Sequence, residues 1–131
     1  MHDVRLLLDT HIALWAIADS PQLAAHARSL ILDPANSIHV SSASVWEIAI
    51  KHMLGRGGMP VSATQAATHF QAAGYIELPI ANAHIAMLET LPPHHADPFD
   101  RLLVAQALAE PLRLLTHDAT VSRYSDSIIL V

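Results

Sequence analysis

Residues 4–9 read VRLLLD, a short and mostly apolar run that ends in a carboxylate. The run is too short to cross a bilayer, and we predict that it forms a strand buried on both faces. Strands of this kind belong to parallel sheets that helices cover on both sides. Ligands bind beyond the carboxyl ends of the strands in such sheets. Asp9, which ends the run, therefore marks the edge where a functional site is expected.

Short apolar runs alternate with helical stretches along the rest of the chain. Strands are predicted at 38–41, 76–78, 112–116 and 127–131, and helices at 10–19, about 44–54, 62–74, 82–91 and 98–110, with a further helix capped by Ser20 and a helical turn near 120–124. This alternation is typical of an α/β fold with a mainly parallel sheet covered on both faces. The length of 131 residues predicts one domain.

The composition limits the functions that the chain can have. Its formal net charge is −5, with one lysine and six arginines, which argues against a broad basic surface for nucleic acid. The absence of cysteine excludes disulfides and thiolate metal sites. Neither a membrane-spanning run nor a signal peptide is recognisable, so we expect a cytoplasmic protein without membrane contact. The apolar content of 52% suggests that another chain covers part of the surface.

Carboxylates follow the predicted strands at the same edge of the sheet. Asp9 follows the first strand, Glu47 lies one turn into the helix after the second, and Asp118 follows the strand at 112–116. Asp97 and Asp100 open the helix that precedes this last strand. Carboxylates that converge repel one another, and a hard divalent cation such as Mg²⁺ or Mn²⁺ would offset that cost. Such sites hydrolyse phosphodiesters.

Each acid also has a purely structural explanation. Glu47 could form a capping box with Ser44 or an ion pair with Lys51. Asp97 and Asp118 could each cap a helix. Only the coincidence of several acids at one edge favours a metal site.

Four segments of the chain carry a family resemblance. They are LLLDTHIALW (6–15), SSASVWEIAIKHMLG (41–55), LPPHHADPFDRLLVAQA (91–107) and LLTHD (114–118). In this order and spacing they resemble the PIN domain family, in particular the VapC-type ribonuclease toxins of bacterial toxin–antitoxin pairs. The resemblance implies a three-layer α/β/α sandwich with a central, mainly parallel sheet of about five strands. It also implies an endoribonuclease that depends on Mg²⁺ or Mn²⁺.

The resemblance assigns roles to particular residues. The catalytic, metal-binding acids fall on Asp9, Glu47, Asp100 and Asp118, with Glu47 acting directly or through water. Supporting positions fall on Thr10, Thr116, Asp97 (as a helix cap or behind the ligands), and Ser41 or Ser42 as a hydroxyl near Glu47. Candidate phosphate contacts are Lys51, Arg56, Arg101 and Arg123, and Arg101 could instead pair with an acid.

The resemblance further implies partners. VapC-type proteins form homodimers and are inhibited by a cognate antitoxin of the VapB or Phd kind, which lays a segment in an apolar groove. Leu14, Trp15, Ile48 and Met53 are the candidate contacts. The substrate is expected to be a structured RNA with an exposed loop, transfer RNA or ribosomal RNA by analogy with the family.

Other functions fit the sequence less well. A haloacid-dehalogenase phosphotransferase needs an aspartate two residues after the first acid, where this chain has His11. A dinucleotide-binding module needs a GxGxxG after the first strand, which is absent. A non-catalytic PIN-like module that binds RNA or protein is the main alternative. The histidines lack zinc-site spacing, although His95 could orient an acid or a phosphate.

Overall fold

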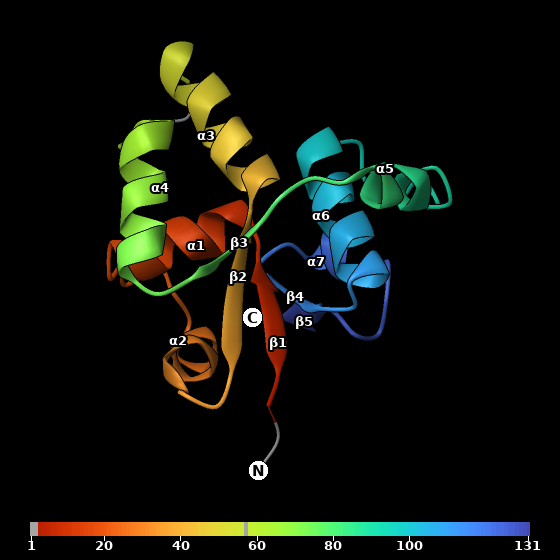
Figure 1. Ribbon diagram of the computed structural model, residues 1–131, viewed down its shortest axis with the longest axis horizontal. Helices are drawn as coiled ribbons and strands as arrows, with labels where there is room; N and C mark the ends of the chain where they lie inside the picture. Colours follow the sequence, from red (N-terminus) through yellow and green to blue (C-terminus); the bar gives the residue numbers. More distant parts are fainter. Residues whose placement is uncertain (1–2, 57) are drawn as a thin grey trace.

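A five-stranded parallel sheet forms the centre of the computed structural model, which describes residues 3–56 and 58–131 (Figure 1). The strand order is β3-β2-β1-β4-β5, and every neighbouring pair is parallel. The strands are β1 (Arg5–Leu8), β2 (Ser37–Ser41), β3 (Ile76–Leu78), β4 (Arg113–Thr116) and β5 (Ile129–Leu130). The expected α/β fold with a mainly parallel sheet is confirmed.

The central strand β1 explains why the opening run is apolar throughout. Leu6 and Leu8 belong to one hydrophobic cluster and Leu7 to the other, because successive side chains of a strand point to opposite faces. All three are fully buried. A strand with helices on both sides therefore needs apolar residues at consecutive positions.

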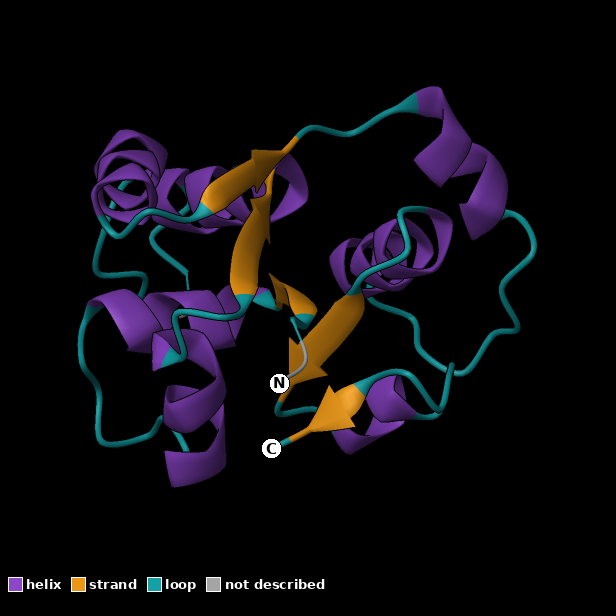
Figure 2. Ribbon diagram, turned by 60° about the horizontal axis from the view of Figure 1, so that its bottom comes forward, coloured by secondary structure: helices purple, strands orange, loops and turns teal. Residues whose placement is uncertain are grey.

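The helices form two layers around this sheet. On one face lie α1 (Thr10–Ile17), α2 (Ala25–Leu32) and α4 (Ala63–Ala72); on the other lie α6 (Pro98–Ala109) and α7 (Ala119–Ser122), with α5 (Asn82–Leu88) packed against α6 (Figures 1 and 2). Helix α3 (Ser42–Met53) leaves the end of β2 and contacts α1, α4 and α6. Across residues 3–56 and 58–131, no helix has the length and apolar character needed to cross a membrane.

The first residues of α6 and α2 can be compared with the helix caps predicted from the sequence. Asp97 caps α6 as predicted, accepting hydrogen bonds from the backbone N–H groups of Phe99 (2.8 Å) and Asp100 (3.2 Å). The predicted cap at Ser20 is wrong, because its hydroxyl only accepts from Gln22 in a turn and α2 begins at Ala25.

The capping box between Ser44 and Glu47 is not formed either. Helix α3 begins at Ser42 with Ser41 as its N-cap, so Ser44 and Glu47 are already inside the helix. Glu47 is thereby free of any capping role.

We expect Leu7→Ala to lower the free energy of unfolding by about 2–5 kcal/mol, because the substitution leaves a cavity next to the central strand β1. Leu32 is 71% exposed, so Leu32→Ala should change it by no more than about 0.5 kcal/mol. Urea unfolding measures both. Equal losses in the two variants would contradict the position of β1 at the centre of the core.

Candidate metal centre

Acids from four elements meet at the carboxyl edge of the sheet. Asp9 and Asp118 follow β1 and β4, whereas α3 and α6 supply Glu47 and Asp100. Burial raises the pKa of Asp100, and the negative charges of Asp97, Glu47 and Asp9 raise it further. Carboxylate oxygens of Asp100 and Asp118 lie within 4.8 Å of each other. The structure therefore gathers the four acids singled out in the sequence.

Thr116 links two of these acids. Its hydroxyl donates to Oδ2 of Asp9 at 2.6 Å and accepts from the backbone N–H of Asp118 at 3.1 Å. The other oxygen of Asp9 caps α1 by accepting from the N–H of Ile12 at 2.8 Å. Burial raises the pKa of Asp9, and the hydrogen bond from Thr116 acts in the opposite direction. Thr116 thus lies where the resemblance placed a supporting hydroxyl.

Glu47 is buried between a hydroxyl and an ammonium group. Its Oε1 accepts from the hydroxyl of Thr10 at 2.7 Å, and its Oε2 accepts from Nζ of Lys51 at 2.8 Å. Thr10 has one hydroxyl hydrogen, so its 2.9 Å contact with Ser44 Oγ has Ser44 as the donor. The ion pair with Lys51 that the sequence suggested is therefore present at a site where Glu47 also faces other acids.

The hydroxyl beside Glu47 was assigned to the wrong serine. Ser41 caps α3 and donates to Oε1 of Gln106 at 2.5 Å, so it serves the core of the protein. The hydroxyl that contacts Glu47 is that of Thr10, and Ser44 in turn contacts Thr10. The sequence indicated this role of Ser44 through its position one helical turn before Glu47. That spacing had instead suggested a capping box.

The pKa values of Asp100 and Asp118 are shifted in opposite directions. Burial, followed by the charges of Asp97, Glu47 and Asp9, raises the pKa of Asp100 to about 7.

Partial burial alone would raise the pKa of Asp118 as well. Hydrogen bonds from His95 and from the backbone N–H groups of Thr120 and Val121 outweigh it, so the pKa of Asp118 is lowered. Asp118 is thus a carboxylate at neutral pH, while Asp100 holds its proton up to that range.

The predicted phosphate contacts divide into two groups. Arg56 and Arg123 are exposed, and Lys51 is held by Glu47. Arg101 does not pair with an acid: its Nη1 donates to the carbonyl oxygen of Pro92 and to the hydroxyl of Tyr124, each at 3.0 Å. The pairing of Arg101 with an acid is therefore wrong among the described residues, because the guanidinium binds the segment before α6 and the residue Tyr124 after α7.

The predicted partner contacts divide as well. Ile48 is fully buried in the core, so its assignment to a binding surface is wrong. Leu14 and Trp15 are partly buried against the same core, and Met53 is 78% exposed.

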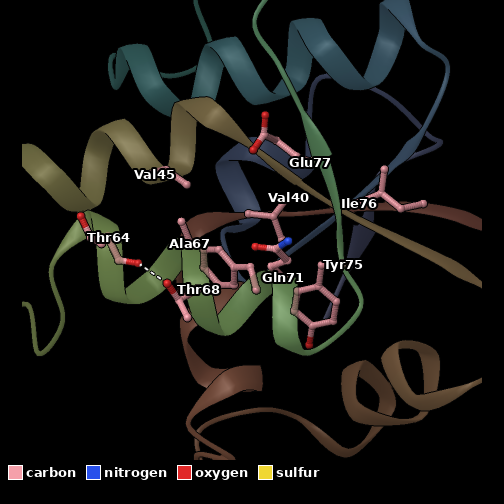
Figure 3. A pocket seen from close by; sticks show the side chains of 10 residues that line it. Val40, Val45, Thr64, Ala67, Thr68, Gln71, Tyr75, Ile76 and Glu77 are labelled. Atoms are coloured by element: carbon pink, nitrogen blue, oxygen red, sulfur yellow. Dashed lines mark hydrogen bonds between the residues drawn. The ribbon is translucent and has the colours of Figure 1, made fainter.

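Two of the hollows in the described part of the chain bear on these predicted contacts. One, between α4, the start of α3 and the edge strand β3, is lined by other residues than the predicted contacts (Figure 3): Val40, Val45, Thr64, Ala67, Thr68, Phe70, Gln71, Tyr75, Ile76 and Glu77. The other adjoins the acids and is lined by Asp9, His11, Trp15, His117, Asp118 and Ala119. In it the rings of Trp15 and His117 pack edge to face at 5.4 Å.

A parallel α/β sandwich with acids gathered at the carboxyl edge is the architecture of a PIN domain. The model of the PIN domain family matches residues 6–126, and the chain belongs to this family. It is 31% identical over 117 residues to Ribonuclease VapC22 of Mycobacterium tuberculosis, covering 86% of both chains. The chain is thus similar to a VapC-type member of the family.

Solved structures agree with the fold. VapBC2 from Rickettsia felis, bound to a DNA fragment from its promoter, matches with a TM-score of 0.67 at 16% identity, covering 98% of both chains. A toxin–antitoxin complex from Klebsiella pneumoniae matches with a TM-score of 0.60 at 16% identity, covering 95% of both chains.

The raised pKa of Asp100 has a measurable consequence for stability. The folded protein holds the Asp100 proton between about pH 4 and pH 7, whereas the unfolded chain loses it near its ordinary pKa of 3.8. This group therefore makes the metal-free protein less stable as the pH rises through that window. We expect Asp100→Asn to be more stable than the parent at pH 8 in chelator, by roughly 1–3 kcal/mol, and nearly equal to it below about pH 4.

Urea unfolding at the two pH values measures the effect, with Asp3→Asn, an exposed residue at the opposite end of β1, as the control. A parent and an Asp100→Asn variant of equal stability at pH 8 would contradict the crowding of charge at this site.

Proposed function

We propose that the protein is a metal-dependent endoribonuclease of the VapC type, and the toxin of a toxin–antitoxin pair. The observation that carries the proposal is the gathering of Asp9, Glu47, Asp100 and Asp118 from four separate elements, with a pKa of about 7 at Asp100. Such crowding destabilises the protein unless a cation is bound. The likeness to Ribonuclease VapC22 supports the type of reaction.

The donor set suits Mg²⁺ or Mn²⁺, because both prefer carboxylate oxygens. Asp9, Asp100 and Asp118 would hold the ion, and Glu47 would do so directly or through water. When bound, the ion supplies a water of lowered pKa and a positive charge that stabilises the phosphodiester during displacement.

The residues of the chain orient these ligands. Thr116 fixes one oxygen of Asp9, and Thr10 and Lys51 each bind one oxygen of Glu47. No side chain needs to bond covalently to the substrate. The chain's part is to keep the carboxylates in place and to present the phosphate for in-line attack.

The substrate fits the same edge of the molecule. The hollow beside Asp9 and Asp118 presents the rings of His11, Trp15 and His117, which suit an unpaired base. An exposed loop of transfer RNA or ribosomal RNA offers such bases. Lys51, Arg56 and Arg123 would contact phosphates, whereas Arg101 is engaged elsewhere.

An antitoxin is the proposed protein partner, as in the toxin–antitoxin complexes that share the fold. Homodimer formation and a cytoplasmic place of action complete the proposal. Exposed apolar side chains on α3, among them Trp46 (54%) and Met53 (78%), are consistent with a covering chain.

The test is cleavage of total cellular RNA by the purified protein, with Mg²⁺ or Mn²⁺ and with chelator. We expect discrete products that form only with the divalent ion. The cleavage rate of Asp9→Asn should be at least roughly 100-fold lower, because loss of a residue that only supports a metal ligand already costs up to about 100-fold, and Asp9 is proposed to be a ligand itself. Asp3→Asn should cleave as the parent does.

Each other outcome has a definite meaning. Equal cleavage by Asp9→Asn would identify a contaminating nuclease. Folded, antitoxin-free protein that binds the ion and cleaves nothing would favour a non-catalytic PIN-like module that binds RNA or protein.

A further inference from the structure

His95 lies between two of the acids assigned to the ion. Its Nε2 is 3.1 Å from Oδ2 of Asp100 and 3.1 Å from Oδ2 of Asp118. All three atoms lie within 4.8 Å of one another, so distances alone allow two functions for the ring. It could be a third ligand of the ion, or a hydrogen-bond donor to both carboxylates.

The other ring nitrogen distinguishes these functions. Nδ1 of His95 lies 3.1 Å from the backbone nitrogen of Asp97, whose N–H can only donate. Nδ1 is therefore the acceptor and carries no hydrogen. The ring hydrogen is on Nε2, which faces the two carboxylates.

A ligating Nε2 would have to give up this hydrogen. Nδ1 would then carry it and would face the N–H of Asp97, donor against donor. Histidines that bind metals have the opposite arrangement, in which the second ring nitrogen donates to a carboxylate, a carbonyl or water. The surroundings of His95 thus favour a donor and disfavour a ligand.

The segment that carries His95 is fixed from outside. The backbone N–H of His95 donates to the hydroxyl oxygen of Tyr124 at 2.9 Å, and Arg101 donates to the same oxygen at 3.0 Å. Arg101 also binds the carbonyl of Pro92, and the ring of His94 packs against Tyr124 with centroids 4.9 Å apart. These contacts hold the ring of His95 at one position above the acids.

We propose that His95 is a positioning residue, which donates its Nε2 hydrogen to Asp118, lies 3.1 Å from Asp100, and so sets the separation of the two carboxylates without binding the ion itself. The inference rests on the proposed function, because it concerns the same acids. A ring N–H that is bonded to Asp118 and also faces Asp100 offsets part of the repulsion between the two carboxylates before the ion arrives. The remaining lone pairs of both carboxylates stay available to the ion.

Two substitutions of His95 distinguish the contribution of Nε2 from that of Nδ1. His95→Gln keeps an N–H donor at about the reach of Nε2, whereas His95→Asn keeps only an acceptor near Nδ1, within reach of the N–H of Asp97. Calorimetric titration with Mn²⁺ should show roughly 10–100-fold weaker binding for His95→Asn, and a loss of less than about 5-fold for His95→Gln. His26→Asn, at an exposed histidine of α2 on the other side of the sheet, is the matched control, with parent-like binding expected. Equal losses in both His95 variants, or no loss in either, would overturn the inference.

The parent protein gives an independent answer. Pulsed electron paramagnetic resonance of its Mn²⁺ complex should show no directly coordinated nitrogen, whereas a coordinated nitrogen that disappears in His95→Gln would make His95 a ligand and overturn the inference. The absence of a coordinated nitrogen in the parent supports the inference even if a variant fails to fold. A folded parent that binds no Mn²⁺ would overturn the proposed function and this inference together, whereas a parent that binds Mn²⁺ with unaffected variants would overturn the inference alone.

Discussion

The repulsion between carboxylates held close together is the main physical constraint on this structure. Four carboxylates lie at one edge of the sheet, and in the absence of a cation their repulsion opposes folding. The protein reduces this repulsion by placing a donor beside each acid. Hydroxyls of Thr116 and Thr10 bind Asp9 and Glu47, and the ring of His95 is hydrogen-bonded to Asp118 and lies 3.1 Å from Asp100. These donors orient the acids, yet leave enough negative charge for a cation.

Helix starts make a second contribution to the same constraint. Asp9, Asp97 and Asp118 cap α1, α6 and α7, so that backbone N–H groups point at their carboxylates. The partial positive charge of a helix N-terminus favours an anion there. Structural and functional explanations of these acids are therefore compatible: the residue that starts the helix is held rigidly by it, and a rigid carboxylate is a better ligand.

The sequence predicted those parts of the protein that depend on local pattern. The apolar run of β1 placed the central strand, and the acids after the strands placed the site, because parallel strands end at a common edge. Errors arose where a contact joins distant segments. Nothing near Arg101 in the sequence indicates Tyr124, and Ser44 meets Thr10 across 34 positions. Ile48 was placed on a surface because an apolar helix face looks alike whether it meets solvent, a partner or the core.

In the proposed nuclease, the ion pair between Lys51 and Glu47 would couple binding of the ion to binding of RNA. A divalent ion at Glu47 would compete with the ammonium group and weaken its ion pair with the carboxylate. The lysine side chain would then be available to a phosphate of the RNA. Thermodynamic reciprocity would require that the RNA strengthen binding of the ion by the same factor. Lys51 is the counter-ion of Glu47 in this structure, and its exchange between carboxylate and phosphate would make the two binding events cooperative.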